Sequence, residues 1–422
     1  MENTTRKGSN LMNIKLTSME KKWVLYDVGN SAFTMLTATI LPIYFNYLAE
    51  SAGVSSVDYL AFWGYAASIS TLIVALLGPT LGSLADAQNY KKKLFIAVLA
   101  VGVVGCVSLG FTSSWIIFLV LYVITKTGYS TSLIFYDAML PDITTEDRMD
   151  TVSSSGYAWG YIGSCIPFVA CLGVVLGAGS LGLSTPTAMM IAFIITALWW
   201  LISSLPMLKI YKQKYYAETA NGHVVSDSFR RLGHTFREIG QEKQVLFFLI
   251  AFFFYIDGVY TIIDMATAYG QALGLDSTGL LLALLLTQIV AFPCALLFGR
   301  ISAKYNPATL ISICIGAYFC IALYAIGLDS QAKFWILAVL VGMFQGTIQA
   351  LSRSYFAKII PAEKSGEYFG ILDICGKGAA FFGTFLVSFV SQVTGKVNAG
   401  VGSLSIMFLL GLFFFRKAAS YK

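Results

Sequence analysis

Residues 91–111 read KKKLFIAVLAVGVVGCVSLGF, which is three lysines followed by eighteen residues without a charged side chain. A membrane-spanning helix needs about 20 mostly apolar residues. A strand of a membrane barrel is about half as long and alternates in polarity. This stretch therefore predicts a membrane-spanning helix with its lysines at the edge of the bilayer.

The composition extends this interpretation to the whole chain. Of its 422 residues, 57% are hydrophobic and 12% are charged, and the mean hydropathy is +0.73. A soluble domain carries about 25% charged residues. The composition therefore excludes a soluble globular protein, a disordered chain and a collagen-like chain, and it predicts an integral, multi-pass membrane protein.

Apolar runs of spanning length recur along the sequence and predict an all-α protein with twelve transmembrane helices. Twelve spans use about 240 residues, which leaves no room for a sizeable soluble domain. We expect the spans at 22–49, 58–85, 92–111, 115–140, 151–176, 187–208, 244–271, 278–302, 308–327, 333–358, 366–392 and 400–416.

The positions of the basic residues predict the orientation in the membrane. Of the 28 lysines and arginines, 24 lie at the chain ends or in the connections on one side. Lys333 and Lys396 lie on the other side, and Lys126 and Lys377 lie inside spans. Because cytoplasmic loops carry an excess of Lys and Arg, both termini are expected in the cytoplasm.

The longest connection, residues 209–243, divides the chain into two halves. Leu232, Phe236 and Ile239 recur in it at helical spacing, so it contains either an amphipathic helix on the inner membrane surface or a solvated linker helix. We expect a cytoplasmic segment 1–21, a six-helix bundle 22–208, the linker 209–243, a second six-helix bundle 244–416 and a cytoplasmic tail 417–422.

A weak internal repeat indicates that the two bundles are pseudo-symmetric. Tyr26-Asp27 in the first span has a counterpart in Tyr255-Ile-Asp257 of the seventh. Gly82-Ser-Leu-Ala-Asp86, at the end of the second span, is similar to Gly299-Arg-Ile-Ser-Ala303 at the end of the eighth.

Ionisable residues inside the spans mark the candidate site. A charged side chain at mid-bilayer costs about 2.5–3.5 kcal/mol on insertion scales, so it persists where it faces a partner or a water-filled cavity. The first, fourth, seventh and tenth spans carry such residues, and the eleventh carries Asp373 and Lys377. This pattern predicts that one helix in every three lines a polar pathway.

Depth in the membrane separates the candidate roles. Asp27, Asp137 and Arg353 lie near the cytoplasmic ends, where they either reach the membrane surface with their charged groups or form a gate. Deeper in the membrane, Lys126 is the candidate for binding an anionic group, and Asp257 for binding a cation or a proton. We expect substrate-binding or ion-coupling roles for Asp27, Asn30, Lys126, Asp257, Asp264, Gln345, Gln349, Asp373 and Lys377, and gating roles for Asp86, Asp137 and Arg353.

One pair in this set has a second interpretation. Asp373 and Lys377 are four residues apart, so they could neutralise each other on one helix face.

Catalytic and cofactor motifs are not found. The sequence has no G-x-x-x-x-G-K-[ST] phosphate loop, and its only histidines, His223 and His234, lie in the central connection. We therefore expect neither an enzyme, nor a metal site, nor a cofactor, nor a nucleic-acid partner. The sequence sets no oligomeric state and is compatible with a monomer.

Several stretches carry a family resemblance. Gly82-x-Leu-Ala-Asp86, followed by Lys91-Lys92 and Leu94, resembles the loop motif between helices 2 and 3 of the major facilitator superfamily. Five further stretches resemble its vacuole-effluxer branch, the family of the autophagy-related vacuolar amino-acid exporter and its bacterial relatives. They are Tyr26–Phe33, Leu140–Asp142, Val152–Gly163, Tyr255–Ile262 and Gln349–Phe356.

The resemblance implies a twelve-helix, two-bundle secondary transporter that works by alternating access in the plasma membrane of a bacterium. Its expected partners are a small organic solute, such as an amino acid, protons or another coupling ion, and membrane lipids. The alternatives are a transporter of a drug, sugar or peptide, and a non-transporting protein such as a lipid scramblase or a sensor. Since Ala303 stands where the second loop motif would have an acid, at most the Asp86 latch is expected.

Overall fold

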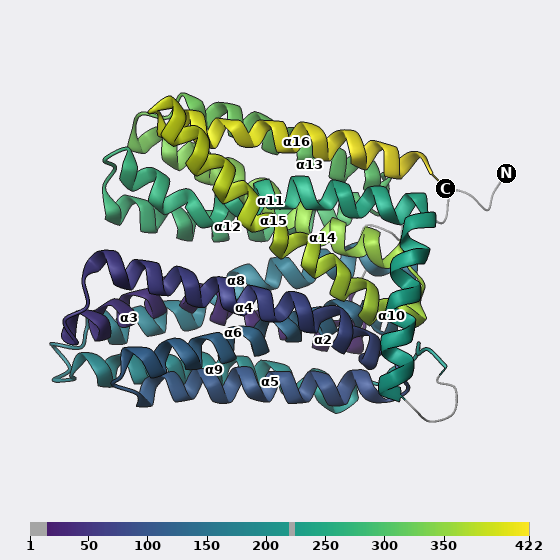
Figure 1. Cartoon of the computed structure of the whole chain (residues 1–422), viewed down its shortest axis with the longest axis horizontal. Helices are drawn as coiled ribbons and strands as arrows, with labels where there is room; N and C mark the ends of the chain where they lie inside the picture. The colour runs from purple at the N-terminus through teal and green to yellow at the C-terminus, as the bar shows by residue number, and fades with distance from the viewer. Residues whose placement is uncertain (1–14, 219–223, 422) are drawn as a thin grey trace.

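The computed structural model describes residues 15–218 and 224–421, and in these ranges it is built from helices (Figure 1). The first half comprises α2 (Ser18–Ala38), α3 (Ile40–Ser51), α4 (Ser56–Ala85), α5 (Tyr90–Ser108), η2 (Leu109–Phe111), α6 (Trp115–Ala138), α7 (Leu140–Ile143), η3 (Glu146–Arg148), α8 (Met149–Leu176) and α9 (Thr185–Ile210). The second half comprises α10 (Val224–Gln241), α11 (Lys243–Ala272), α12 (Ser277–Ile301), α13 (Pro307–Ile326), α14 (Gln331–Ile359), η4 (Ala362–Lys364), α15 (Ser365–Thr394) and α16 (Val397–Ser420).

Twelve helical segments in the described ranges are long and apolar enough to cross a membrane. They coincide with the twelve expected spans to within a few residues at most ends. Large apolar side chains such as Val104, Leu176 and Phe413 are exposed on the outside of the structure. That surface suits contact with lipid, and the chain is an integral multi-pass membrane protein.

The first span differs from the expected single helix, because it breaks at Thr39 into α2 and α3. Pro42 explains the position of the break. A proline lacks the amide hydrogen of a helical bond, and its ring clashes with the carbonyl four residues earlier, here that of Ala38.

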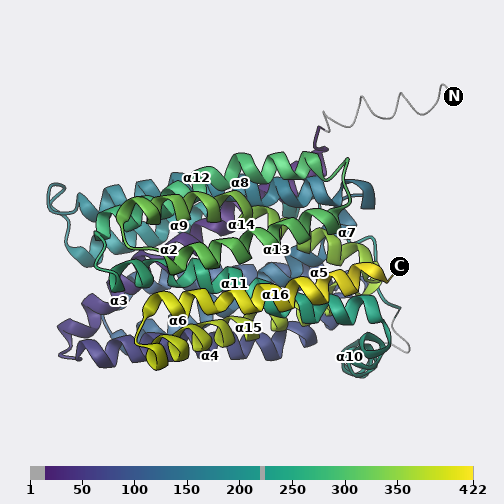
Figure 2. The same ribbon diagram turned by 90° about the horizontal axis from the view of Figure 1, so that it is seen from above.

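The helices form two bundles, α2–α9 and α11–α16, which lie side by side (Figures 1 and 2). Equivalent helices make equivalent contacts: α2 packs on α8 and α9, and α11 packs on α15 and α16. The Tyr26 hydroxyl bonds Ser132 at 2.7 Å, and the Tyr255 hydroxyl bonds Ser352 at the same distance. These matched contacts confirm two pseudo-symmetric six-helix bundles.

The bundles meet mainly along α4 with α15 and α8 with α12, and α8 also contacts α14. The start of α2 and the end of α16 lie at one end of the molecule, called here the termini face, and the other end is the opposite face (Figure 1). Along α4 and α15 the backbones touch: a Cβ on Gly370 would lie 2.6 Å from the Gly78 carbonyl oxygen.

The predicted amphipathic helix is α10, which crosses the termini face and contacts α4 of one bundle and α11 of the other (Figure 1). Ile239 of α10 is buried, Phe236 is exposed, and Glu238 pairs with Lys364 at 2.6 Å. The helix is thus held against the protein. Residues 1–14 of the predicted N-terminal segment and residue 422 of the predicted tail lie outside the residues that the structure describes.

Candidate functional site

A cavity of about 370 Å³ lies between the two bundles, and we call it the central cavity. Side chains of α2, α6 and α8 line it from one bundle, and side chains of α11, α12, α14 and α15 from the other. Its wall contains nine of the candidate residues: Asp27, Asn30, Asp137, Asp264, Gln345, Gln349, Arg353, Asp373 and Lys377.

Arg353 of α14 joins the two bundles at the end of the cavity nearer the termini face. Its Nη1 donates to Asp137 Oδ1 at 2.9 Å, and its Nη2 lies 3.5 Å from Asp27 Oδ2. Its Nε donates to the Ser153 hydroxyl at 2.8 Å, and Nη2 also donates to the Ser153 carbonyl at 2.9 Å. We call Arg353, Asp27, Asp137 and Ser153 the Arg353 cluster.

Neighbouring side chains hold this cluster in place. The Tyr136 hydroxyl donates to Asp27 Oδ2 at 2.9 Å, and the Asn30 amide donates to Asp27 Oδ1 at 3.2 Å. The guanidinium carbon lies 4.4 Å from the Tyr157 ring centre and 4.8 Å from that of Trp23. Such contacts favour an arginine, because its planar cation stacks on aromatic faces and its several N–H groups donate forked hydrogen bonds to carboxylates. Arg353 is 4% exposed, so these partners replace its water.

Asp86, at the end of α4, forms the second link between the bundles. Its two carboxylate oxygens accept hydrogen bonds from the backbone amides of Gly366 and Glu367 at 2.8 and 2.9 Å. Those amides form the first turn of α15, where unpaired N–H groups and the helix dipole favour an anion. Lys91 lies beside it, and its Nζ donates to the Ser365 hydroxyl at 2.9 Å. The predicted Asp86 latch therefore corresponds to a real inter-bundle contact.

The Asp86 contact predicts a pH-dependent stability. Burial raises the pKa of this carboxyl from 3.8 to about 7, against the opposing effects of Lys91 and the two amide donors. Because the folded-state pKa is the higher one, this contribution to stability is complete below pH 3.8 and is lost as the pH rises to about 7. As the pH rises through that window, the melting temperature in detergent should fall less for Asp86→Asn than for the wild type. Parallel melting curves would contradict this assignment.

A third link joins α8 to α14 and corrects the expectation of at most one latch. Asp150, at the start of α8, pairs with Lys358 of α14 at 2.7 Å and accepts a hydrogen bond from the Ser354 hydroxyl at 2.6 Å. Near it, the Thr151 hydroxyl donates to the carbonyl of Gly299 at 3.1 Å. An acid at position 303 is not needed, because the first bundle supplies the carboxylate.

Deeper in the cavity, charges of both signs come together. Asp373 and Lys377 form an ion pair at 2.6 Å, and both side chains line the cavity. Asp264 of α11 is exposed to the cavity. Lys126 of α6 is within electrostatic range of Lys377 and Asp264. Contrary to the expectation for an anion-binding residue, Lys126 does not line the central cavity, and its Nζ lies 5.3 Å from the ring centre of Tyr129.

Asp257 does not face the central cavity, contrary to the expectation for a residue of the pathway. It is fully buried where α11 packs on α15, and its Oδ1 accepts a hydrogen bond from the Thr261 hydroxyl at 3.2 Å. A Cβ on Gly383 would lie 2.5 Å from that oxygen, so a glycine allows the close approach. Its Oδ2 has no hydrogen-bond partner within the described ranges.

Several residues of the site escaped the sequence interpretation. Asp150 and Lys358 lie at span ends, where a charge is normally attributed to a loop. Ser153, Tyr157 and Tyr161 of α8 contact Arg353 or line the cavity. They lie in a helix without interior charges, so the charge pattern could not select them. The Val152–Gly163 stretch that resembles the effluxer branch contains all three.

The comparisons with known proteins agree with this architecture. The family described as "Vacuole effluxer Atg22 like" matches residues 18–419. The chain is 41% identical over 403 residues to the "Uncharacterized MFS-type transporter YxiO" of Bacillus subtilis, with 94% of each chain covered. It is 23% identical to "Autophagy-related protein 22" of Coccidioides immitis, with 84% of this chain and 71% of that one covered.

A solved structure supports the fold. The crystal structure of the E. coli fucose:proton symporter FucP matches with a TM-score of 0.72 at 14% identity, over 95% of this chain and 97% of that one. At this identity the likeness shows a shared fold and does not carry the substrate across.

Proposed function

The chain belongs to the vacuole effluxer Atg22-like family and is an MFS-type transporter, and from this premise we propose a secondary active transporter of a small organic solute. The solute we propose is an amino acid, moved by alternating access and coupled to protons. The observation that carries the proposal is the central cavity, in which charged side chains of both bundles converge.

The charges in the cavity suit a zwitterion. We propose that Lys377, released from its pair with Asp373, binds a carboxylate with support from the nearby Lys126, and that Asp264 accepts from an ammonium group. Asn30, Gln345 and Gln349 add uncharged donors and acceptors to the cavity wall. A site with both signs of charge holds such a solute without leaving either of its groups unpaired.

We place the termini face at the cytoplasm, because the sequence assigns 24 of the 28 lysines and arginines to the chain ends and the connections of one side, and cytoplasmic loops carry an excess of them. The membrane we propose is the plasma membrane of a bacterium. In this conformation the Arg353 cluster, Asp86 and Asp150 close the cytoplasmic side, and we propose that the cavity opens to the opposite face. Transport then requires these three links to break while the opposite ends of the bundles approach.

The proton-coupling residue we propose is Asp257. A buried carboxylate without a cation is costly, so we propose that Asp257 carries a proton in this conformation and releases it when α11 and α15 move. Asp257→Asn should abolish uptake driven by a pH gradient and leave exchange of solute between the two sides. Proteoliposome assays with and without an imposed gradient measure both activities. Unimpaired gradient-driven uptake by the variant would exclude this role.

Counterflow in proteoliposomes tests the function as a whole. Vesicles loaded with pooled amino acids should accumulate a labelled amino acid from outside, while vesicles without protein should not. Other pools (sugars, peptides, drug-like cations) are tested in parallel, and counterflow with one of these alone would reassign the substrate. Lipid flipping without any solute counterflow would favour a scramblase instead.

A further inference from the structure

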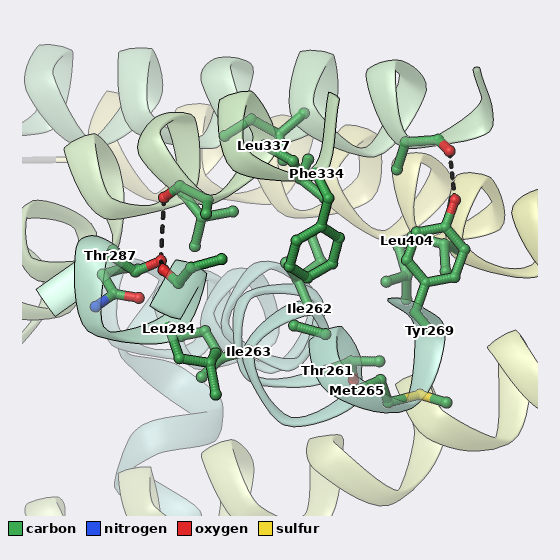
Figure 3. Close-up of a pocket in the computed structure, with 18 of the residues that line it drawn as sticks. Thr261, Ile262, Ile263, Met265, Tyr269, Leu284, Thr287, Phe334, Leu337 and Leu404 are labelled. Carbon is green, nitrogen blue, oxygen red and sulfur yellow. Dashed lines mark hydrogen bonds between the residues drawn. The ribbon is translucent and has the colours of Figure 1, made fainter. Parts of the chain in front are cut away.

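The second bundle contains a separate cavity of about 60 Å³, which we call the side cavity. It is enclosed mainly by α11, α12, α13 and α14. Figure 3 shows Phe334 pointing towards Ile262, with Leu284 and Ile263 on one side and Tyr269 and Leu404 on the other.

The wall of the side cavity is mainly apolar, because its hydroxyl groups already have partners: those of Tyr269 and Thr287 bond backbone carbonyls, and that of Thr261 donates to the Asp257 carboxylate. The Tyr269 hydroxyl donates to Ala325 at 2.6 Å, and the Thr287 hydroxyl lies 2.9 Å from the carbonyl oxygen of Ala283 and 3.2 Å from that of Ala338 (Figure 3). The rest of the wall consists mainly of aliphatic and aromatic side chains. An apolar cavity of this kind stays free of water and binds apolar groups.

The side cavity adjoins the central cavity. Ile263, Gln288 and Gln345 line both of them, so the two spaces share a boundary formed by α11, α12 and α14. Gln345 is 2% exposed, and its amide oxygen Oε1 has no hydrogen-bond partner in the described ranges. Because an unpaired buried carbonyl costs free energy, this oxygen is available to a donor group placed at the boundary.

We propose that the side cavity is a specificity subsite that takes a short apolar group of the transported solute, while Gln345 Oε1 accepts a hydrogen bond from the same solute. This inference rests on the proposed function, since it assumes that the solute occupies the central cavity. A cavity of about 150 Å³ holds benzene, and a water needs about 15 Å³. By that scale the subsite accommodates about two to four heavy atoms.

The test is a homologous series of straight-chain neutral amino acids, from glycine through alanine and norvaline to norleucine, competing in proteoliposome counterflow. The wild type should prefer the members with about two to four side-chain carbons. One methylene in an apolar pocket changes selectivity by about 10-fold or more. We therefore expect steps of that size along the series.

Two variants should move the preference in opposite directions, which a folding defect cannot do. Ala338→Leu fills the side cavity. Relative to the wild type, it should favour competition by the shorter members over the longer ones by about 10-fold. Leu337→Ala enlarges it and should favour norleucine by a similar factor. Ala332→Leu and Leu323→Ala make the same substitutions at exposed positions of α14 and α13. These controls should leave the wild-type preference unchanged.

Gln345→Leu tests the polar half of the proposal. It removes the acceptor and should weaken competition by all members of the series by a similar factor. The preferred side-chain length should not change.

The outcomes distinguish the two proposals. Normal counterflow with a length preference that neither Ala338→Leu nor Leu337→Ala changes would overturn the side-cavity inference and leave the proposed function intact. If pooled amino acids show counterflow in the wild type but no member of the series competes, the subsite inference fails and the proposed function stands. If no amino acid shows counterflow, both fail.

Discussion

Replacing Arg353 by alanine should lower the free energy of unfolding by about 3–5 kcal/mol, the usual effect of removing one partner from a buried ion pair. The reason lies in what remains: Asp27 and Asp137, two carboxylates of the first bundle, would be left without the cation that the second bundle supplies. The Ser153 contacts would be lost as well. Solute transport should fall to background. Denaturant unfolding in detergent measures the stability, and counterflow measures the transport.

A neutral triple variant separates the charge effect from closure of the gate. In Asp27→Asn, Asp137→Asn, Arg353→Gln no charge is left unpaired, so much of the stability should return while transport stays lost. Arg353→Lys keeps the charge but loses the forked geometry. Its free energy of unfolding should lie between those of Arg353→Ala and the triple variant. Wild-type stability and transport in Arg353→Ala would show that the Arg353 cluster does not hold the bundles together.

Gly370→Val should open the termini face. A Cβ at this position would lie 2.6–2.8 Å from backbone atoms of Gly78 and Pro79, so α15 could no longer rest on α4. Overpacking of this kind costs about 1–3 kcal/mol, which corresponds to a shift of about 5- to 150-fold between two conformations. A membrane-impermeant thiol reagent should label Ser365→Cys from the termini face much faster in this variant than without it. This assay requires replacing the seven native cysteines.

The matched control is Gly316→Val, in the middle of α13. No atom lies within 4 Å of the position of its Cβ, so the same change of residue meets no neighbour. It should leave the labelling rate unchanged. Equal rates in Gly370→Val and Gly316→Val would mean that the close approach of α4 and α15 does not control access.

Most of the fold was predictable, because in a bilayer the backbone must satisfy its own hydrogen bonds and the spans must be long and apolar. The twelve runs followed from that, the division at residues 209–243 followed from the length of that connection, and the family resemblance rested on separate sequence motifs. The break at Thr39 was not predicted, although Pro42 explains it. The apolar run continues across the break, so hydropathy does not detect it.

The site was predictable to the extent that charges inside spans need partners. Asp27, Asp137 and Arg353 were expected at a similar depth near the cytoplasmic ends, and the structure in addition brings them into contact. The depth of a residue in the membrane does not predict which way its side chain faces around the helix axis. For this reason Asp257 was expected in the cavity although it packs on Gly383, and Asp150 was missed although it bonds Lys358.

Distances between paramagnetic labels on the two bundles would test alternating access most directly. One pair of labels replaces the exposed Ser113 and Asp329 at the opposite face, and the other replaces Asp147 and Lys304 at the termini face. Introducing Gly370→Val should lengthen the distance at the termini face and shorten the one at the opposite face. If both distances stay fixed in Gly370→Val and in Arg353→Ala, the two bundles do not rock about the central cavity, and transport by alternating access is contradicted.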